Sequence, residues 1–170
     1  MKSIATPSRR ARRLIGAVAL LSAAACGGSA AVGGAGATAA SPQPFRGDVE
    51  RTQFDPSLDV NLAAMSRRPD DMYVQDLTVG TGGVATLGRT VVVRYTGWLP
   101  SGKQFDTGEV TVTLGSNKTI RAWEVGLLGM RVGGKRRIVV PPALGYGDQA
   151  TGSIPANSVL IFNMEMLSLL

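Results

Sequence analysis

Residues 72–170 alternate between apolar and polar side chains over most of their length, and they show the spacing of a helix only once. Alternation with a period of two is typical of half-buried strands. Residues 90–98 carry the clearest pattern, a β-branched and aromatic run that places Val91, Val93 and Tyr95 on one face. Further extended segments are expected at residues 73–77, 104–106, 110–114, 135–140 and 159–167. This part of the chain therefore predicts a sheet.

The single helical pattern begins at Ile120. Ile120, Trp123 and Leu127 recur at helical spacing, which predicts one buried helical face. Gly126 and Gly129 limit the helix to about two or three turns, because glycine weakens helix interiors and favours helix ends. A sheet of several strands with one short helix indicates an α+β domain in which the sheet wraps around the helix.

Composition narrows the function classes. The chain carries 18 Lys and Arg against 12 Asp and Glu, a net charge of +6. Five of those basic residues lie within the first 13 positions, so 13 remain against 12 in the rest of the chain, and we expect no nucleic-acid partner. The chain has no His and one Cys, which excludes His-dependent catalysis, intrachain disulfides and the usual zinc sites. We expect neither a metal nor a cofactor.

The first 25 residues predict an export signal. Residues 1–13 are basic, and the apolar run 14–25 is shorter than the roughly 20 residues that a membrane-spanning helix needs. Cys26 follows Ala23-Ala24-Ala25 directly, and this arrangement resembles the lipobox of bacterial lipoproteins, which are cut before a Cys that carries lipid. The resemblance implies that lipid on Cys26 anchors the protein to a membrane of the bacterial cell envelope, at the periplasmic or outer face. A plain secreted protein is the alternative.

The remaining N-terminal segments predict spacers. Residues 26–41 consist of small residues without periodicity after the Cys, which is typical of a flexible tether. Residues 42–71 combine turn formers with a short apolar pattern from Leu58 to Met65, and we expect a partly ordered lead-in. The folded domain is then expected at 72–170, and a monomer is expected because no dimerisation segment is visible before it.

Five short motifs follow one another in the predicted domain. They are Val93-Arg-Tyr-Thr-Gly-Trp-Leu99, Gly102-Lys-Gln-Phe-Asp106, Ile120-Arg-Ala-Trp-Glu-Val-Gly-Leu127, Arg137-Ile-Val-Val-Pro-Pro-Ala-Leu-Gly-Tyr-Gly147 and Ile154-Pro-Ala-Asn-Ser-Val-Leu-Ile-Phe162. In this order and spacing they resemble the FKBP-type peptidyl-prolyl cis-trans isomerases. The resemblance implies a half-barrel-like antiparallel sheet around one short α-helix, with an apolar proline pocket between them.

The same resemblance implies the site residues. The implied catalytic residues are Tyr95, Asp106, Tyr146 and Phe162. The implied substrate-binding residues are Phe105, Val112, Thr119, Ile120, Trp123 and Ile154. In this assignment Trp123 forms the bottom of the pocket, and the backbone N–H group of Ile120 and the hydroxyl group of Tyr146 hold the peptide carbonyls.

These residue types fit prolyl isomerisation. Rotation about a peptide bond has a barrier of about 18–20 kcal/mol but makes and breaks no covalent bond, so the site needs no nucleophile, metal or His. We therefore expect an isomerase that assists the folding of exported proteins, with proline-containing polypeptides as substrates and macrolides as inhibitors. The alternative is a noncatalytic module of the same fold that binds proline-containing segments or acts as a chaperone. The complete aromatic set favours the enzyme.

Overall fold

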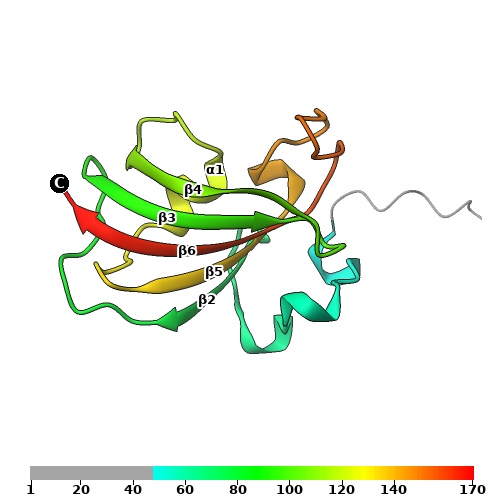
Figure 1. Ribbon diagram of the computed structural model, residues 1–170, viewed down its shortest axis with the longest axis horizontal. Helices are drawn as coiled ribbons and strands as arrows, with labels where there is room; N and C mark the ends of the chain where they lie inside the picture. Colours follow the sequence, from blue (N-terminus) through cyan, green and yellow to red (C-terminus); the bar gives the residue numbers. More distant parts are fainter. Residues whose placement is uncertain (1–47) are drawn as a thin grey trace, which may run out of the picture. The chain divides into compact units, whose positions relative to one another are not determined.

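The computed structural model describes residues 48–170, and the predicted signal peptide, the tether and Cys26 lie outside them. The described chain forms one six-stranded antiparallel sheet of order β1-β2-β5-β6-β3-β4 (Figure 1). The strands are β1 (Ser66–Arg67), β2 (Tyr73–Thr78), β3 (Thr90–Trp98), β4 (Gln104–Thr113), β5 (Lys135–Val140) and β6 (Leu160–Leu169). The helices are α1 (Arg121–Gly126) and the short 3-10 helices η1 (Val49–Arg51), η2 (Pro56–Leu58), η3 (Leu62–Ala64) and η4 (Pro142–Leu144).

The main core lies between α1 and one face of the sheet. Val91 and Val93 of β3 are fully buried there, as the alternation in the sequence predicts. Trp123 and Leu127 contribute the buried side of the helical segment. Each fully buried apolar side chain of this size contributes about 1.5–3 kcal/mol. The predicted α+β fold, an antiparallel sheet around one short helix, is confirmed.

A second apolar cluster covers part of the opposite face of the sheet. Val139 and Ile161 project from β5 and β6 on this side, and Leu58 and Met65 of the N-terminal segment pack against them. Residues 48–71, the described part of the lead-in expected at 42–71, thus contribute side chains that pack on the sheet, and β1 pairs with β2. The packed part of the chain begins before Met72, because these strands are apolar on both faces and the second face needs a cover.

Two extended segments that the sequence separates are one strand in the structure. β4 runs unbroken through Thr107, Gly108 and Glu109, and these residues pair with β3. The register between β3 and β4 shifts only at the C-terminal end of β3, between Gly97 and Trp98. β4 is the last strand of the sheet and therefore an edge strand. No helix in residues 48–170 is long and apolar enough to cross a membrane.

Candidate active site

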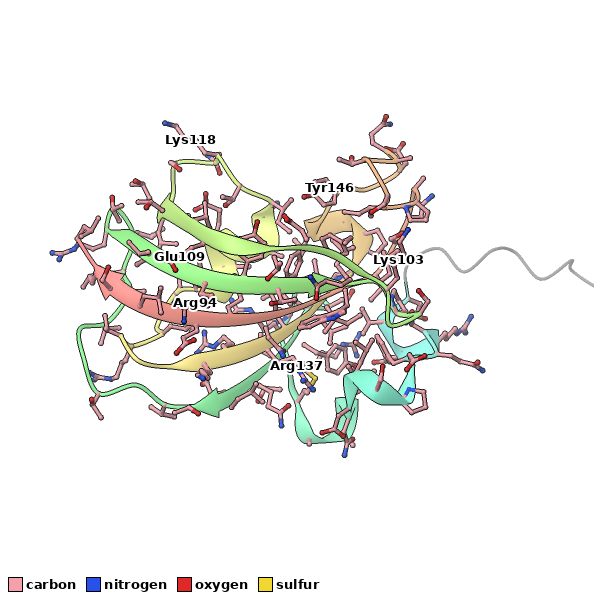
Figure 2. All side chains as sticks on the ribbon, in the orientation of Figure 1. Arg94, Lys103, Glu109, Lys118, Arg137 and Tyr146 are labelled. Carbon is pink, nitrogen blue, oxygen red and sulfur yellow. The ribbon has the colours of Figure 1, made fainter. Side chains whose placement is uncertain are left out.

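A cavity of about 450 Å³ opens beside the start of α1, where the sheet, the loop after β4 and the segment after β5 meet. Eight of the ten predicted site residues line it: Tyr95, Phe105, Asp106, Thr119, Ile120, Trp123, Tyr146 and Phe162. In Figure 2 Tyr146 lies on the segment after β5, and Lys118 extends from the loop after β4 toward solvent. Side chains that are far apart in the sequence thus converge on one pocket.

The other two predicted residues do not line the cavity. Val112 is 3% exposed and Ile154 is 6% exposed, and both belong to the hydrophobic core. Val110 lines the pocket instead. Val110 and Val112 lie two positions apart on the same face of β4, so the alternation alone could not tell which of them reaches the pocket.

Two further lining residues were not predicted. Asn117 and Lys118 come from the loop between β4 and α1, where no periodic pattern marks a residue as facing inward. Their only sequence signal is their place directly before Thr119, which the resemblance did assign to the site. Loop residues of this kind are positioned by the scaffold around them.

Four aromatic rings form a continuous edge-to-face chain in the pocket. The ring of Tyr95 lies 4.7 Å from that of Trp123, centre to centre, at an interplanar angle of 74°. Trp123 in turn meets Phe162 at 5.6 Å and 88°. Phe162 meets Phe105 at 5.6 Å and 89°. Each such ring pair contributes about 0.5–1.5 kcal/mol to stability beyond the burial of its area. The four rings together form one packed apolar wall of the pocket.

Gly97 of β3 makes room for two of these rings. A Cβ atom at Gly97 would lie 2.7 Å from Cζ of Phe105 and 2.9 Å from Cε1 of Phe162. Both distances are far shorter than van der Waals contact between carbon atoms. The two phenylalanine rings therefore rest directly on the backbone of β3, and only glycine allows this approach.

Asp106 is the acidic group of the pocket. Its Oδ2 atom accepts a hydrogen bond of 2.7 Å from the hydroxyl group of Tyr95, and its Oδ1 atom accepts one of 2.9 Å from the backbone N–H group of Thr107. Burial, and then the hydrogen bond to Asp106, raise the pKa of Tyr95 to about 12. Burial also raises the pKa of Tyr146, and the charge of Asp106 adds to that shift. Both phenols are therefore protonated donors at neutral pH.

Two donors that line the pocket have no acceptor among the described residues. They are the backbone N–H group of Ile120, which is the N-cap residue of α1, and the hydroxyl group of Tyr146. The indole Nε1 atom of Trp123 is a third unpaired donor, buried in the wall. Ile120 is half-buried and Tyr146 is exposed, so both donors are open to solvent and can hold carbonyl oxygens of a bound peptide in place of water.

A buried carboxylate fixes the loop that leads to Ile120. Glu124 of α1 is 7% exposed, and its carboxylate accepts hydrogen bonds from the backbone N–H groups of Gly115 and, at 3.0 Å, Asn117. At the other end of α1, Arg136 of β5 donates to the carbonyl oxygen of Gly126 at 2.7 Å. Both ends of the helix that carries Trp123 are thus tied to their surroundings.

A protein-family model described as FKBP-type peptidyl-prolyl cis-trans isomerase matches residues 82–167, which is half of the chain and includes every residue of the pocket. The chain belongs to this family. The resemblance of the five motifs to the FKBP-type isomerases is therefore confirmed at the level of the family.

Relatives of the FKBP family match the same region. The chain is 43% identical over 118 residues to FK506-binding protein 4 of Chaetomium thermophilum, a match that covers 67% of this chain and 23% of that protein. It is 39% identical over 102 residues to the FK506-binding protein of Neisseria meningitidis serogroup A, which covers 56% of this chain and 94% of that protein. This chain therefore spans less than a quarter of the first relative and nearly all of the second.

Solved FKBP structures agree with the fold. The crystal structure of AtFKBP13 superposes with a TM-score of 0.58 at 32% sequence identity, over 61% of this chain and 97% of that chain. The crystal structure of FkpA from Escherichia coli gives the same TM-score and identity over 62% of this chain and 51% of that chain. Both matches place the sheet and the short helix in one known arrangement.

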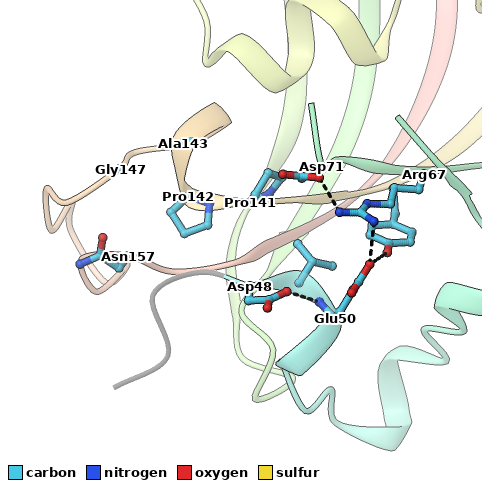
Figure 3. A pocket seen from close by; sticks show the side chains of 11 residues that line it. Asp48, Glu50, Arg67, Asp71, Pro141, Pro142, Ala143, Gly147 and Asn157 are labelled. Atoms are coloured by element: carbon cyan, nitrogen blue, oxygen red, sulfur yellow. Dashed lines mark hydrogen bonds and ion pairs between the residues drawn. The ribbon is translucent and has the colours of Figure 1, made fainter. Parts of the chain in front are cut away.

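A larger cavity, of about 530 Å³, lies between the N-terminal segment and the turn at Pro141 and Pro142 (Figure 3). Its charged groups satisfy one another. Arg67 lies 3.1 Å from the carboxylate of Glu50 and 2.7 Å from that of Asp71. It holds no aromatic cluster comparable to that of the FKBP pocket. Among residues 48–170, no three His, Cys, Asp or Glu side chains come together in a way that could hold a metal ion.

Proposed function

We propose that the chain is a peptidyl-prolyl cis-trans isomerase that works without covalent chemistry. The observation that carries the proposal is the pair of unpaired donors, the N–H group of Ile120 and the hydroxyl group of Tyr146, beside an aromatic pocket. Proline-containing polypeptides are the proposed substrates, because proline is the residue whose preceding bond populates both isomers.

The pocket acts first on the solvation of the amide. Its apolar walls, formed by Phe105, Trp123 and Phe162, take the proline ring and remove water from the bond before it. The twisted amide has lost its resonance and is less polar than the planar one, so an apolar site favours it. No residue of the pocket needs to accept or donate a proton during the rotation.

The donors then fix the chain on either side of the rotating bond. The N–H group of Ile120 and the hydroxyl group of Tyr146 hold carbonyl oxygens, so only one part of the peptide turns. To bring a process of tens of seconds to milliseconds, the barrier must fall by roughly 5–7 kcal/mol. Desolvation, two positioned donors and the field of Asp106 can supply this together.

Refolding tests the enzyme against the binding module. A reporter protein whose slow refolding phase is set by a proline isomer should refold faster when catalytic amounts of the full chain are present. A macrolide of the FK506 class is the proposed inhibitor, since the matched relatives are named for FK506, and it should abolish the acceleration. A module that only binds proline segments would slow refolding, or leave it unchanged at catalytic amounts.

We further propose that the protein is exported and lipid-anchored at Cys26, and that it assists the folding of exported proteins. The support is the sequence alone: a basic segment, an apolar run, and a single Cys directly after it. Several acyl chains hold a protein on a membrane more stably than one. Cys26→Ser should move the protein to the soluble export fraction and abolish fatty-acid labelling, whereas unchanged membrane retention would contradict the anchor.

A further inference from the structure

The outer edge of β4 is open. β3 pairs with β4 along one side, from Thr90 opposite Thr113 to Trp98 opposite Gln104. Among residues 48–170 no strand pairs with the other side, and Figure 1 shows β4 at the border of the sheet. The ten residues of β4 therefore have no neighbouring strand on their outer side.

The ladder fixes which backbone groups point outward. The N–H group of Leu114 donates to the carbonyl oxygen of Arg89, so this pair faces β3. Backbone groups alternate in direction along an antiparallel strand, so Thr107, Glu109 and Thr111 direct their N–H and C=O groups away from β3. The hydrogen bond of Thr107 is consistent with this alternation, because its N–H group donates to the side chain of Asp106 and not to β3.

The same strand forms one wall of the proline pocket. Phe105, Asp106 and Val110 of β4 line the cavity. Gly108 lies between them and has no side chain, and a Cβ atom there would meet nothing closer than Tyr95 at 3.8 Å. No side chain therefore closes the pocket at Gly108. A bound polypeptide that leaves the pocket can pass over Gly108 to the outer edge of β4.

We propose that β4 binds an extended segment of the substrate polypeptide as an added strand while the proline of that segment occupies the pocket. The proposal rests on the proposed function and names its substrate class: unfolded, extended polypeptide whose residues beside the proline can pair as a strand. Proline has no N–H group, so the flanking residues supply the pairing. Strand addition of this kind uses main-chain hydrogen bonds and is tolerant of sequence.

A second copy of the chain fits the edge less well. Antiparallel pairing of two β4 strands centred on the exposed stretch brings the two Glu109 side chains together, and like charges across a strand pair are unfavourable. An unfolded polypeptide carries no such fixed charge pattern. The edge itself bears polar β-branched side chains, Thr107 and Thr111, which are exposed and suited to strand pairing.

The test compares peptides on the full chain. A short capped peptide confined to the pocket is measured beside one extended by about four residues on each side of the proline. We expect kcat/KM to be about tenfold higher for the long peptide, as a few added main-chain hydrogen bonds would give. Single backbone N-methyl groups, placed in turn along the long peptide, should remove the gain at every second position only, because alternate N–H groups face β4.

Neighbouring N-methyl positions are matched controls for one another. Equal kcat/KM for short and long peptides, or N-methyl effects without a period of two, would overturn the proposal while leaving the proposed function intact. If neither peptide is isomerised, the proposed function itself fails, and this proposal with it.

A variant of the edge adds an independent readout. Thr111→Pro removes one outward N–H group, which edge strands tolerate, and should bring the ratio of long-peptide to short-peptide kcat/KM to about one. Thr111→Val keeps the N–H group and should keep the ratio. If Thr111→Pro does not fold, the N-methyl series decides. A dimer that forms through β4 and excludes long peptides would also overturn the proposal.

Discussion

The hydroxyl group of Tyr95 on β3 donates a 2.7 Å hydrogen bond to Asp106 on β4, across the strand pair at the mouth of the pocket. The same tyrosine ring packs edge-to-face on Trp123, 4.7 Å away. One residue thus links the only acidic group of the pocket to its aromatic wall, so a change at Asp106 acts on both.

Replacement of Asp106 should therefore lower activity without unfolding the protein. Asp106 is exposed, so Asp106→Ala should leave the melting temperature nearly unchanged. Loss of the acceptor for Tyr95 and of the charge should reduce kcat/KM by about tenfold. Asp106→Asn keeps an acceptor oxygen and loses only the charge, so the two variants separate these contributions. Wild-type kcat/KM in Asp106→Ala would contradict the role.

The tyrosine hydroxyl groups should lose their protons at a higher pH than free tyrosine does. The pKa of Tyr95 is raised to about 12, and those of Tyr73 and Tyr146 are raised as well. A phenol whose pKa is higher in the folded than in the unfolded state stabilises the fold fully below about pH 10, where both states keep the proton. Above about pH 10 the unfolded phenol loses its proton first, so the free energy of unfolding should fall between about pH 10 and 12. Ultraviolet titration of Tyr95→Phe should lack the last transition, and its free energy of unfolding should fall less steeply with pH. A Tyr95 transition near pH 10 would be the contrary result.

Gly97→Ala should displace two aromatic rings of the pocket and lower the free energy of unfolding. The new methyl group would lie 2.7 Å from the ring of Phe105, so Phe105 and Phe162 must move, at a cost of about 1–3 kcal/mol in unfolding free energy. Gly108→Ala on the neighbouring strand is the matched control for stability, because its Cβ atom has 3.8 Å of space. Chemical denaturation measures both variants. Equal stability of the two would show that the rings do not depend on Gly97.

Replacement of Arg136 should lower the free energy of unfolding much more than replacement of Arg94. The side chain of Arg136 is 11% exposed and bonds Asp76 and the carbonyl oxygens of Gly126 and Leu128. Arg136→Met should lower the free energy of unfolding by about 2–4 kcal/mol. Arg94, 58% exposed, pairs with carboxylates only at 3.4 Å, and Arg94→Met should cost less than about 1 kcal/mol. A similar loss in both variants would contradict the anchoring of α1 by Arg136.

The strands and the core face of α1 follow from local patterns. Alternation in β3 predicts that Val91 and Val93 are buried, and the structure confirms it. The packing of residues 48–71 could not be predicted in the same way, because a short apolar pattern does not name its partner. A signal was present: Ile138-Val139-Val140 is apolar on both faces, and a strand buried on both faces needs a cover on each.

At the candidate site, too, the sequence motifs predict some residues and leave others undecided. The motifs bring together Tyr95, Trp123 and Phe162, which lie on three different elements. They do not separate Val110, which lines the pocket, from Val112, which is buried. That difference depends on which side chains of other elements surround each valine, which no pattern within one strand contains.

In the proposed mechanism, an aromatic pocket with fixed donors rotates the prolyl bond without proton transfer. NMR exchange spectroscopy on a short Xaa-Pro peptide with the full chain measures this rotation directly. The account predicts that cis–trans exchange accelerates from tens of seconds to milliseconds, at a rate nearly flat between about pH 6 and 8, because the chain has no His and its pocket phenols titrate far above that window. A peptide that binds in the pocket but exchanges at its uncatalysed rate, or a steep titration within that window, would contradict it.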